Sequence, residues 1–247
     1  STAWPNVTKS PEEDGLGFTF KWNMGWMHDF LEYMKLDPYF RKFNHNKMTF
    51  GITYCTSENF ILVLSHDEVV HLKCSMINKM PGEYEDKFAN LKVGYTFMLG
   101  HPGKKLLFMG QDFGQFHEWD EKVSLDWYLA KEPFHADLQN YVKGLLTLYH
   151  KYPALYRLDE EYDGFQWINA NDGDRSIFSF IRRDETQKKN LLFICNFTPV
   201  DRDDYRVGVP KRGTYTLLLD QEHGYYKRGD KISHYRSIKS ECDGQPY

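Results

Sequence analysis

The sequence lacks the features that mark several classes of protein. Its four cysteines include no C-x-x-C pair, and 247 residues can bury a core that needs no disulfide scaffold. No apolar run approaches the roughly 18 residues of a membrane span. With 31 basic against 35 acidic residues, the chain carries no cationic excess for tracking phosphates. We therefore expect a globular protein of the cytoplasm that binds neither membrane nor nucleic acid.

Aromatic residues, in contrast, are abundant. Phenylalanine, tyrosine and tryptophan together make up 17% of the chain. Such side chains fill hydrophobic cores, and their flat faces also stack on sugar rings. Composition alone does not separate these two uses.

The first part of the chain reads as alternating strands and helices. Residues 15–22, 60–64 and 105–109 are largely unbroken apolar runs, which are typical of parallel strands covered on both faces. Helices are predicted over residues 26–33, 88–99 and 136–152, the last from its i, i+3, i+4, i+7 apolar spacing. This pattern predicts an α/β fold.

The pattern changes after residue 157. Short strands are predicted over residues 165–168, 176–181, 191–197, 205–209 and 214–219, separated by turn residues. Such spacing predicts an antiparallel β-sandwich. We therefore divide the chain into residues 1–157 and an all-β domain, 158–247. A (β/α)₈ barrel needs roughly 250 residues, so the first part holds only about three of its units.

Polar side chains follow each predicted strand of the first part. His66 and Asp67 come directly after residues 60–64, and catalytic groups gather at the carboxyl ends of parallel strands. The alternative is that Ser65 or Asp67 caps a helix. Asp112 follows the third strand and fits a structural role at least as well. Trp22 ends the first strand, in a segment that could line a sugar site or simply fill the end of a barrel.

Other chemistry finds no support in the sequence. His66 and His71 are five residues apart, which places them on different faces of a helix and disfavours a shared metal ion. No P-loop, G-x-G-x-x-G or G-x-S-x-G motif is present. We expect neither a metal site nor a cofactor.

Several segments together resemble the glycogen branching enzymes of the α-amylase superfamily. Residues 62–71 (LVLSHDEVVH) are similar to that superfamily's fourth conserved region. Further similar segments occur in order along nearly the whole chain: residues 20–29 (FKWNMGWMHD), 79–82 (KMPG), 87–91 (KFANL), 108–115 (FMGQDFGQ), 124–127 (SLDW), 195–199 (CNFTP) and 205–210 (YRVGVP).

This resemblance implies an enzyme that cuts an α-1,4-glucan chain and reattaches it through an α-1,6 link, with α-1,4-glucan or glycogen as its partner. By resemblance, Asp67 is the carboxylate that stabilises the transition state, and His66 and Trp22 bind substrate. The family's nucleophile and general acid lie on the fourth and fifth barrel strands. The chain resembles only the later part of such an enzyme, namely the last three barrel strands and a β-domain lacking its last strand.

We therefore expect a segment that needs the missing N-terminal half of the barrel and is inactive alone. Leu72 and Cys74 stand where the family usually has small residues such as glycine, and Asp112 stands where Glu is commoner. Two alternatives remain open at this point. One is a glucan-binding or interaction segment without chemistry, and the other is a related glycosidase such as a trehalose-forming hydrolase.

Overall fold

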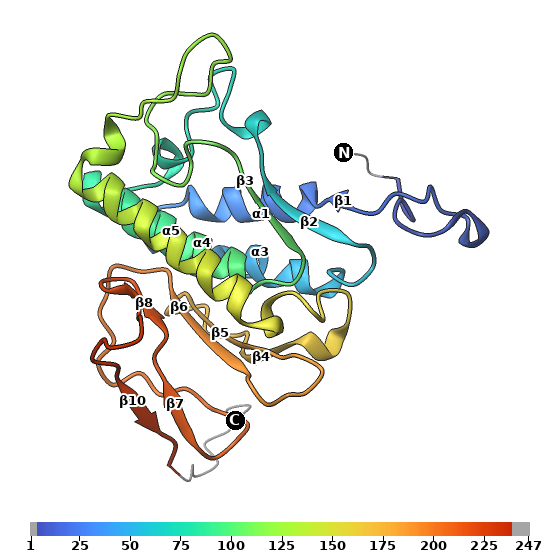
Figure 1. Ribbon diagram of the computed structural model, residues 1–247, viewed down its shortest axis with the longest axis vertical. Helices are drawn as coiled ribbons and strands as arrows, with labels where there is room; N and C mark the ends of the chain where they lie inside the picture. Colours follow the sequence, from blue (N-terminus) through green and yellow to red (C-terminus); the bar gives the residue numbers. More distant parts are fainter. Residues whose placement is uncertain (1–3, 239–247) are drawn as a thin grey trace.

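The first part of the chain forms a parallel three-stranded sheet in the computed structural model, which describes residues 4–238. The strands are β1 (Lys21–Trp22), β2 (Phe60–Leu64) and β3 (Lys104–Leu107), in the order β1-β2-β3 (Figure 1). The second strand is as predicted. The first is shorter than expected, because residues 4–20 form turns and a short 3-10 helix instead of pairing with β2.

Helices connect and follow these strands. They are α1 (Met24–Met34), α2 (Pro38–Arg41), α3 (Asn46–Thr49), α4 (Tyr84–Gly100) and α5 (Pro133–Lys151). Local sequence explains where they begin. Asn23 Oδ1 accepts a hydrogen bond from Trp26 N at the start of α1, and Glu83 and Asp86 form a reciprocal capping box at the start of α4.

Short 3-10 helices lie in the connections between these elements. They are Pro11–Glu13, Lys42–Asn44, Phe50–Thr53, His66–Glu68, Ile77–Lys79, Leu129–Lys131, Pro153–Leu155 and Tyr162–Gly164. The turn His66–Glu68, called η4 below, directly follows β2.

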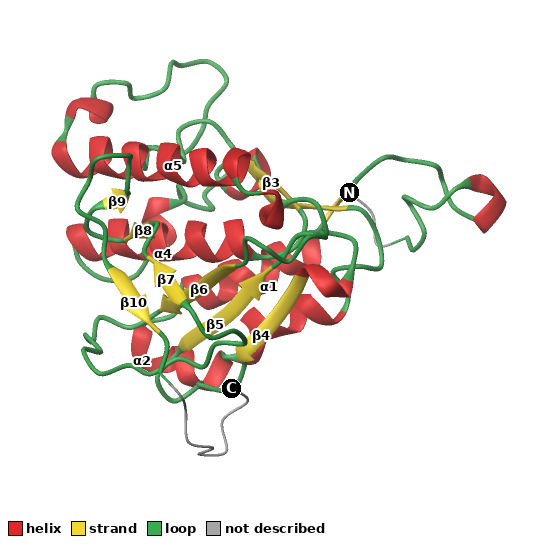
Figure 2. Cartoon of the chain, turned by 60° about the horizontal axis from the view of Figure 1, so that its bottom comes forward, coloured by secondary structure: helices red, strands yellow, loops and turns green. Residues whose placement is uncertain are grey.

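The second part is antiparallel throughout its described strands, as predicted. A three-stranded sheet has the order β4-β5-β6, and two ribbons pair β7 with β10 and β8 with β9 (Figure 2). The strands are β4 (Phe165–Asn169), β5 (Ile177–Arg182), β6 (Leu191–Asn196), β7 (Thr214–Thr216), β8 (Leu219–Asp220), β9 (Gly224–Tyr225) and β10 (His234–Arg236).

One predicted strand is wrong. Residues 205–209 are irregular, and their position is fixed by a side chain, because Tyr205 donates its hydroxyl to Asp172 Oδ2 at 3.0 Å. The predicted strand over residues 214–219 is divided between β7 and β8. Residues 243–247, whose sequence resembles the turn before the missing last strand of the β-domain, lie outside the described residues.

A single hydrophobic core joins the two parts of the chain. Phe97 of α4 contacts Phe178 and Phe180 of β5 edge-on, and Tyr33 of α1 meets Phe178 in the same way. These rings are almost completely buried. Most of the buried aromatic side chains therefore belong to this core. The division of the chain into two domains at residue 157 remains a prediction.

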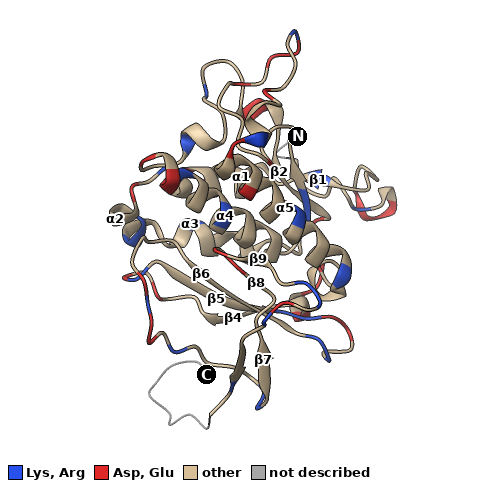
Figure 3. Cartoon of the chain, turned by 60° about the vertical axis from the view of Figure 1, so that its left-hand side comes forward, with Lys and Arg blue, Asp and Glu red and all other residues tan. Residues whose placement is uncertain are grey.

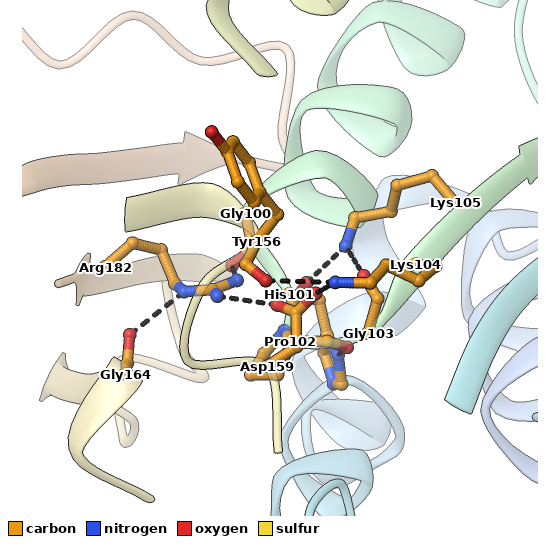
Figure 4. A network of polar contacts seen from close by, with 10 residues as sticks. All are labelled: Gly100, His101, Pro102, Gly103, Lys104, Lys105, Tyr156, Asp159, Gly164 and Arg182. Atoms are coloured by element: carbon orange, nitrogen blue, oxygen red, sulfur yellow. Dashed lines mark hydrogen bonds and ion pairs between the residues drawn. The ribbon is translucent and has the colours of Figure 1, made fainter. Parts of the chain in front are cut away.

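A buried ionic network reinforces this junction (Figure 4). Arg182 of β5 donates to Gly164 O at 3.0 Å, Gly100 O at 2.9 Å and Asp159 Oδ1 at 2.8 Å. Lys104 of β3 donates to the other oxygen of Asp159 at 2.9 Å. Elsewhere, charges of both signs are spread over helices and loops (Figure 3), in keeping with the net charge of −4.

Candidate functional site at the carboxyl edge of the parallel sheet

The carboxyl ends of β1, β2 and β3 lie at one edge of the sheet, because the three strands are parallel (Figure 1). Trp22 is the last residue of β1 and pairs with Ile61. His66 and Asp67 lie two and three residues beyond β2, and Phe108 follows β3, bonded through its N–H to Leu64 O. The fold thus brings the predicted site residues to a common edge.

His66 and Asp67 form a pair that faces solvent. His66 Nε2 lies 3.2 Å from Asp67 Oδ1, and the two side chains are 45% and 54% exposed. Ser65, at the N-cap position of η4, makes no capping hydrogen bond through its side chain within the described residues. The geometry favours an accessible carboxylate over the helix-capping alternative.

Aromatic rings flank this pair. The His66 ring lies 5.8 Å from the Phe108 ring and 6.1 Å from the Trp119 ring, and the last two meet edge-to-face at 5.2 Å. Trp119 N also donates to Val69 O at 2.9 Å, which joins its loop to the segment after η4. Rings packed in this way restrict the orientation of the imidazole beside Asp67.

The segment from His71 to Cys74 borders the pair and has an unusual backbone. His71, Leu72 and Cys74 have positive φ angles of 55°, 65° and 67°. Glycine adopts such angles without a steric cost, whereas other residues are strained by roughly 1 kcal/mol or more. These angles favour glycine at such positions, and they leave Leu72 and Cys74 with strained backbones.

Polar contacts hold this segment in place. Glu118 accepts hydrogen bonds from Leu72 N at 3.0 Å and from Cys74 N at 2.6 Å. Lys73 Nζ donates to Asp67 O at 2.7 Å, and Lys79 Nζ donates to Lys73 O. Burial lowers the pKa of Lys79, and the Lys35 charge lowers it further.

A shallow hollow adjoins the pair. It encloses about 250 Å³, including space open to solvent, and its lining includes Val69, Met109 and Trp119. Asp67 does not line it. Only about 10 Å³ of that space is true cavity volume, far below the roughly 300–1,000 Å³ of ordinary ligand pockets, so the described residues enclose no ligand-sized pocket there.

Asp112 has a different role from the site residues. Its Oδ2 accepts a hydrogen bond from Gln139 Nε2 of α5 at 3.0 Å, which supports the structural interpretation. Glu118 and Trp119 are contributors that the sequence pattern did not single out. The one local sign in the sequence that this loop has a special role is Trp119, a bulky apolar residue between two charged neighbours.

No helix among residues 4–238 is long and apolar enough to cross a membrane. Within that same range, no three His, Cys, Asp or Glu side chains lie close enough together to hold a metal ion.

Comparison with known proteins shows which proteins the chain is similar to. Residues 167–247 match the family model described as "Alpha amylase, C-terminal all-beta domain". The 1,4-alpha-glucan branching enzyme GlgB of Butyrivibrio fibrisolvens is 58% identical over all of this chain and 39% of its own length. The GlgB of Aquifex aeolicus is 51% identical over 92% of this chain and 36% of its own length.

Solved structures agree on the fold. A type I pullulanase of Bacillus subtilis, complexed with maltose, matches with a TM-score of 0.65 and 16% identity over 87% of this chain and 33% of its own. AmyP in complex with maltose matches with a TM-score of 0.56 and 14% identity over 90% and 46%. Over nearly its whole length the chain is similar to part of the branching enzymes named GlgB, and its fold is that of the α-amylase-type enzymes above. It spans about two fifths of the length of the curated relatives that it matches.

Proposed function

We propose that the protein carrying this chain is a 1,4-α-glucan branching enzyme, which cleaves α-1,4-glucan chains and reattaches them by α-1,6 links in glycogen synthesis. The observation that carries this proposal is 58% identity to such an enzyme over the whole chain. The exposed His66–Asp67 pair at the carboxyl edge of the sheet supports it, since catalytic groups of barrel enzymes occupy that edge.

In the proposed reaction, Asp67 stabilises the positive charge that develops on the sugar ring. A fixed carboxylate does this electrostatically, without forming a bond. Its 54% exposure leaves it accessible to a sugar, and His66 Nε2 lies close enough to share a hydroxyl with it. Trp22, partly buried at the end of the adjacent strand, is the proposed stacking surface for substrate.

Two further carboxylates complete a retaining glycosyl transfer. A nucleophile attacks the anomeric carbon and expels the leaving chain, which a general acid protonates. A hydroxyl of the acceptor chain then displaces the covalently held sugar. We assign both of these groups to a part of the protein outside this chain, in agreement with the fraction of its relatives that the chain spans.

The same view assigns β1, β2 and β3 to the last three strands of a (β/α)₈ barrel, over residues 1–157, with the all-β domain in residues 158–247. Leu16, Phe18 and Phe20, which precede and flank β1, are exposed. Such an exposed apolar segment fits the N-terminal half of a barrel as its partner. The isolated chain is therefore proposed to be inactive. Free thiols at Cys55, Cys74 and Cys195 fit the reducing cytoplasm as its location.

The test compares intact protein with a variant at the proposed stabiliser. Amylose treated with intact protein should lose iodine absorbance and gain α-1,6 linkages, quantified by NMR of the undigested product. Asp67→Asn should lower the rate about a hundredfold or more, because the charge is lost while the shape is kept. The control Asp174→Asn removes an exposed charge in the all-β part and should leave the rate unchanged.

The products decide among the related activities. Short oligosaccharides or trehalose without new α-1,6 links would contradict branching and support a related glycosidase. Retardation in glycogen gels without any change in the glucan would support a binding segment. The isolated chain should leave the iodine spectrum of amylose unchanged, and branching by that chain would contradict its proposed dependence on a partner.

A further inference from the structure

The segment beside Asp67 is held by one carboxylate that comes from a distant loop. Glu118 lies 46 and 44 positions along the chain from the two residues whose N–H groups it binds, Leu72 and Cys74. Each of its two oxygens accepts one of these hydrogen bonds. Charge-assisted bonds of this kind are roughly twice as strong as neutral ones.

The strained backbone between His71 and Cys74 explains why this segment needs such a restraint. Left-handed φ angles at Leu72 and Cys74 persist only where surrounding contacts over-determine the backbone. Burial does not supply this restraint, because Leu72 is 95% exposed and Cys74 is exposed. The Glu118 carboxylate supplies it through the main chain.

The hold extends to the proposed transition-state stabiliser. Lys73 lies between the two residues that Glu118 binds, and its ammonium group donates to Asp67 O at 2.7 Å. Lys79 fixes Lys73 from the other side by donating to its carbonyl oxygen. Next to Glu118, Trp119 binds Val69 O and packs against the His66 ring. The loop thus braces both members of the pair.

We propose that Glu118 is a positioning residue for glucan transfer: it fixes the main chain at Leu72 and Cys74 and, through Lys73, orients Asp67. This inference rests on the proposed branching function. Glu118 itself is assigned no contact with the substrate. Its removal therefore weakens the alignment of Asp67 in the transition state more than it weakens the binding of glucan.

The test uses the intact protein and the variants Glu118→Ala and Glu118→Gln. Alanine removes both acceptors, and glutamine keeps one carbonyl oxygen but replaces the other acceptor with an NH₂ donor. The matched control is Glu121→Ala, which deletes an exposed carboxylate three residues further along the same loop. Hydrogen–deuterium exchange of the peptide containing residues 69–75 is measured together with kcat and KM for amylose.

Glu118→Ala should speed exchange in that peptide about tenfold or more, since two protected amides are released. Its kcat should fall roughly tenfold to a hundredfold with KM changed less than about twofold, as expected for misplacement of a group that acts in the transition state. Glu118→Gln should give intermediate values, and Glu121→Ala should match the wild type in both measurements.

Two further variants separate positioning from a general loss of structure. Adding Leu72→Gly and Cys74→Gly to Glu118→Ala should recover part of kcat, because glycine adopts the left-handed angles without strain. Lys73→Met should lower kcat while leaving exchange of the peptide containing residues 69–75 slow, since it breaks only the link to Asp67.

Unchanged exchange in Glu118→Ala would refute the claim that Glu118 restrains the main chain at Leu72 and Cys74. Faster exchange with an unchanged kcat would refute the positioning role. Because exchange needs no substrate, it distinguishes these results from failure of the proposed function, in which the wild-type protein would form no α-1,6 links at all. That last result would overturn the role of Glu118 in branching, whatever the exchange showed.

Discussion

Replacing Asp159 with asparagine should destabilise the junction between the two parts of the chain. Asp159 is almost fully buried and holds Arg182, whose side chain is completely shielded from solvent, at 2.8 Å. Asparagine preserves the shape and one acceptor but removes the only side-chain carboxylate that pairs with Arg182 in the described residues. The guanidinium would remain buried without its counter-charge, and breaking a buried pair in this way costs about 3–5 kcal/mol.

The pKa of Asp159 gives an independent magnitude. Burial by itself raises this pKa, but the charges of Lys105, Arg182 and Lys104 outweigh it and lower the pKa from 3.8 to about 2. A shift of that size corresponds to about 2 kcal/mol of stability. Because the folded-state pKa is depressed, this contribution is present above the unfolded value near 3.8 and is lost as the pH falls through about 2.

Urea unfolding followed by tryptophan fluorescence at pH 7 and pH 2.5 measures both effects. We expect Asp159→Asn to lower the free energy of unfolding by several kcal/mol at pH 7, with a smaller difference from wild type at pH 2.5. The control Asp163→Asn removes an exposed carboxylate nearby and should change stability little. A loss below about 1 kcal/mol at pH 7, or an equal loss at both pH values, would refute this reasoning.

Three further perturbations test the packing. Gly100→Ala should lower the free energy of unfolding by about 1–3 kcal/mol, because the new Cβ would lie 2.6 Å from Phe180 Cε2. The control Gly213→Ala, whose Cβ would have no atom within 4 Å, should be tolerated, and equal denaturation midpoints for the two variants would contradict this. Arg41→Lys should lower Tm, because one ammonium group cannot reproduce the three hydrogen bonds that the guanidinium donates, to Phe197 O, Met34 O and Asn90 Oδ1. An unchanged melting curve would argue against that network. In a Cys242→Ser background, a thiol reagent at pH 8 should modify the exposed Cys74 first, because burial raises the pKa of Cys55 to about 11 and that of Cys195 to about 12. Early labelling of Cys195 in a peptide map would contradict its buried position.

Local pattern was sufficient for the most regular elements. The apolar run of residues 60–64 became β2 at the predicted bounds, and the periodic segment of residues 136–152 became most of α5. Elements whose position depends on side-chain anchoring were harder to predict. Residues 205–209 look like a strand, yet Tyr205 is anchored to Asp172 in an irregular segment. A single sequence carries no signal for such a contact between distant residues.

The candidate site divides in the same way. His66 and Asp67 were predicted because they directly follow a buried strand, and Trp22 because it ends another. Glu118 was not predicted, since its function depends on two backbone N–H groups more than 40 positions away. Glutamate in a polar loop is ordinarily a solvated side chain, and only the folded geometry distinguishes this one.

The sequence by itself determined the longer strands and helices of the first part, the change to an all-β part, and the motifs that carry the resemblance to branching enzymes. These features depend on neighbouring residues, whose periodicity and composition are visible along the chain. The tertiary structure alone decided which distant groups meet: Arg182 with Gly100 and Asp159, and Glu118 with the strained segment beside Asp67. The physical reason is that these contacts arise from the packing of the sheet and helices, which brings backbone groups to charges far away in the sequence.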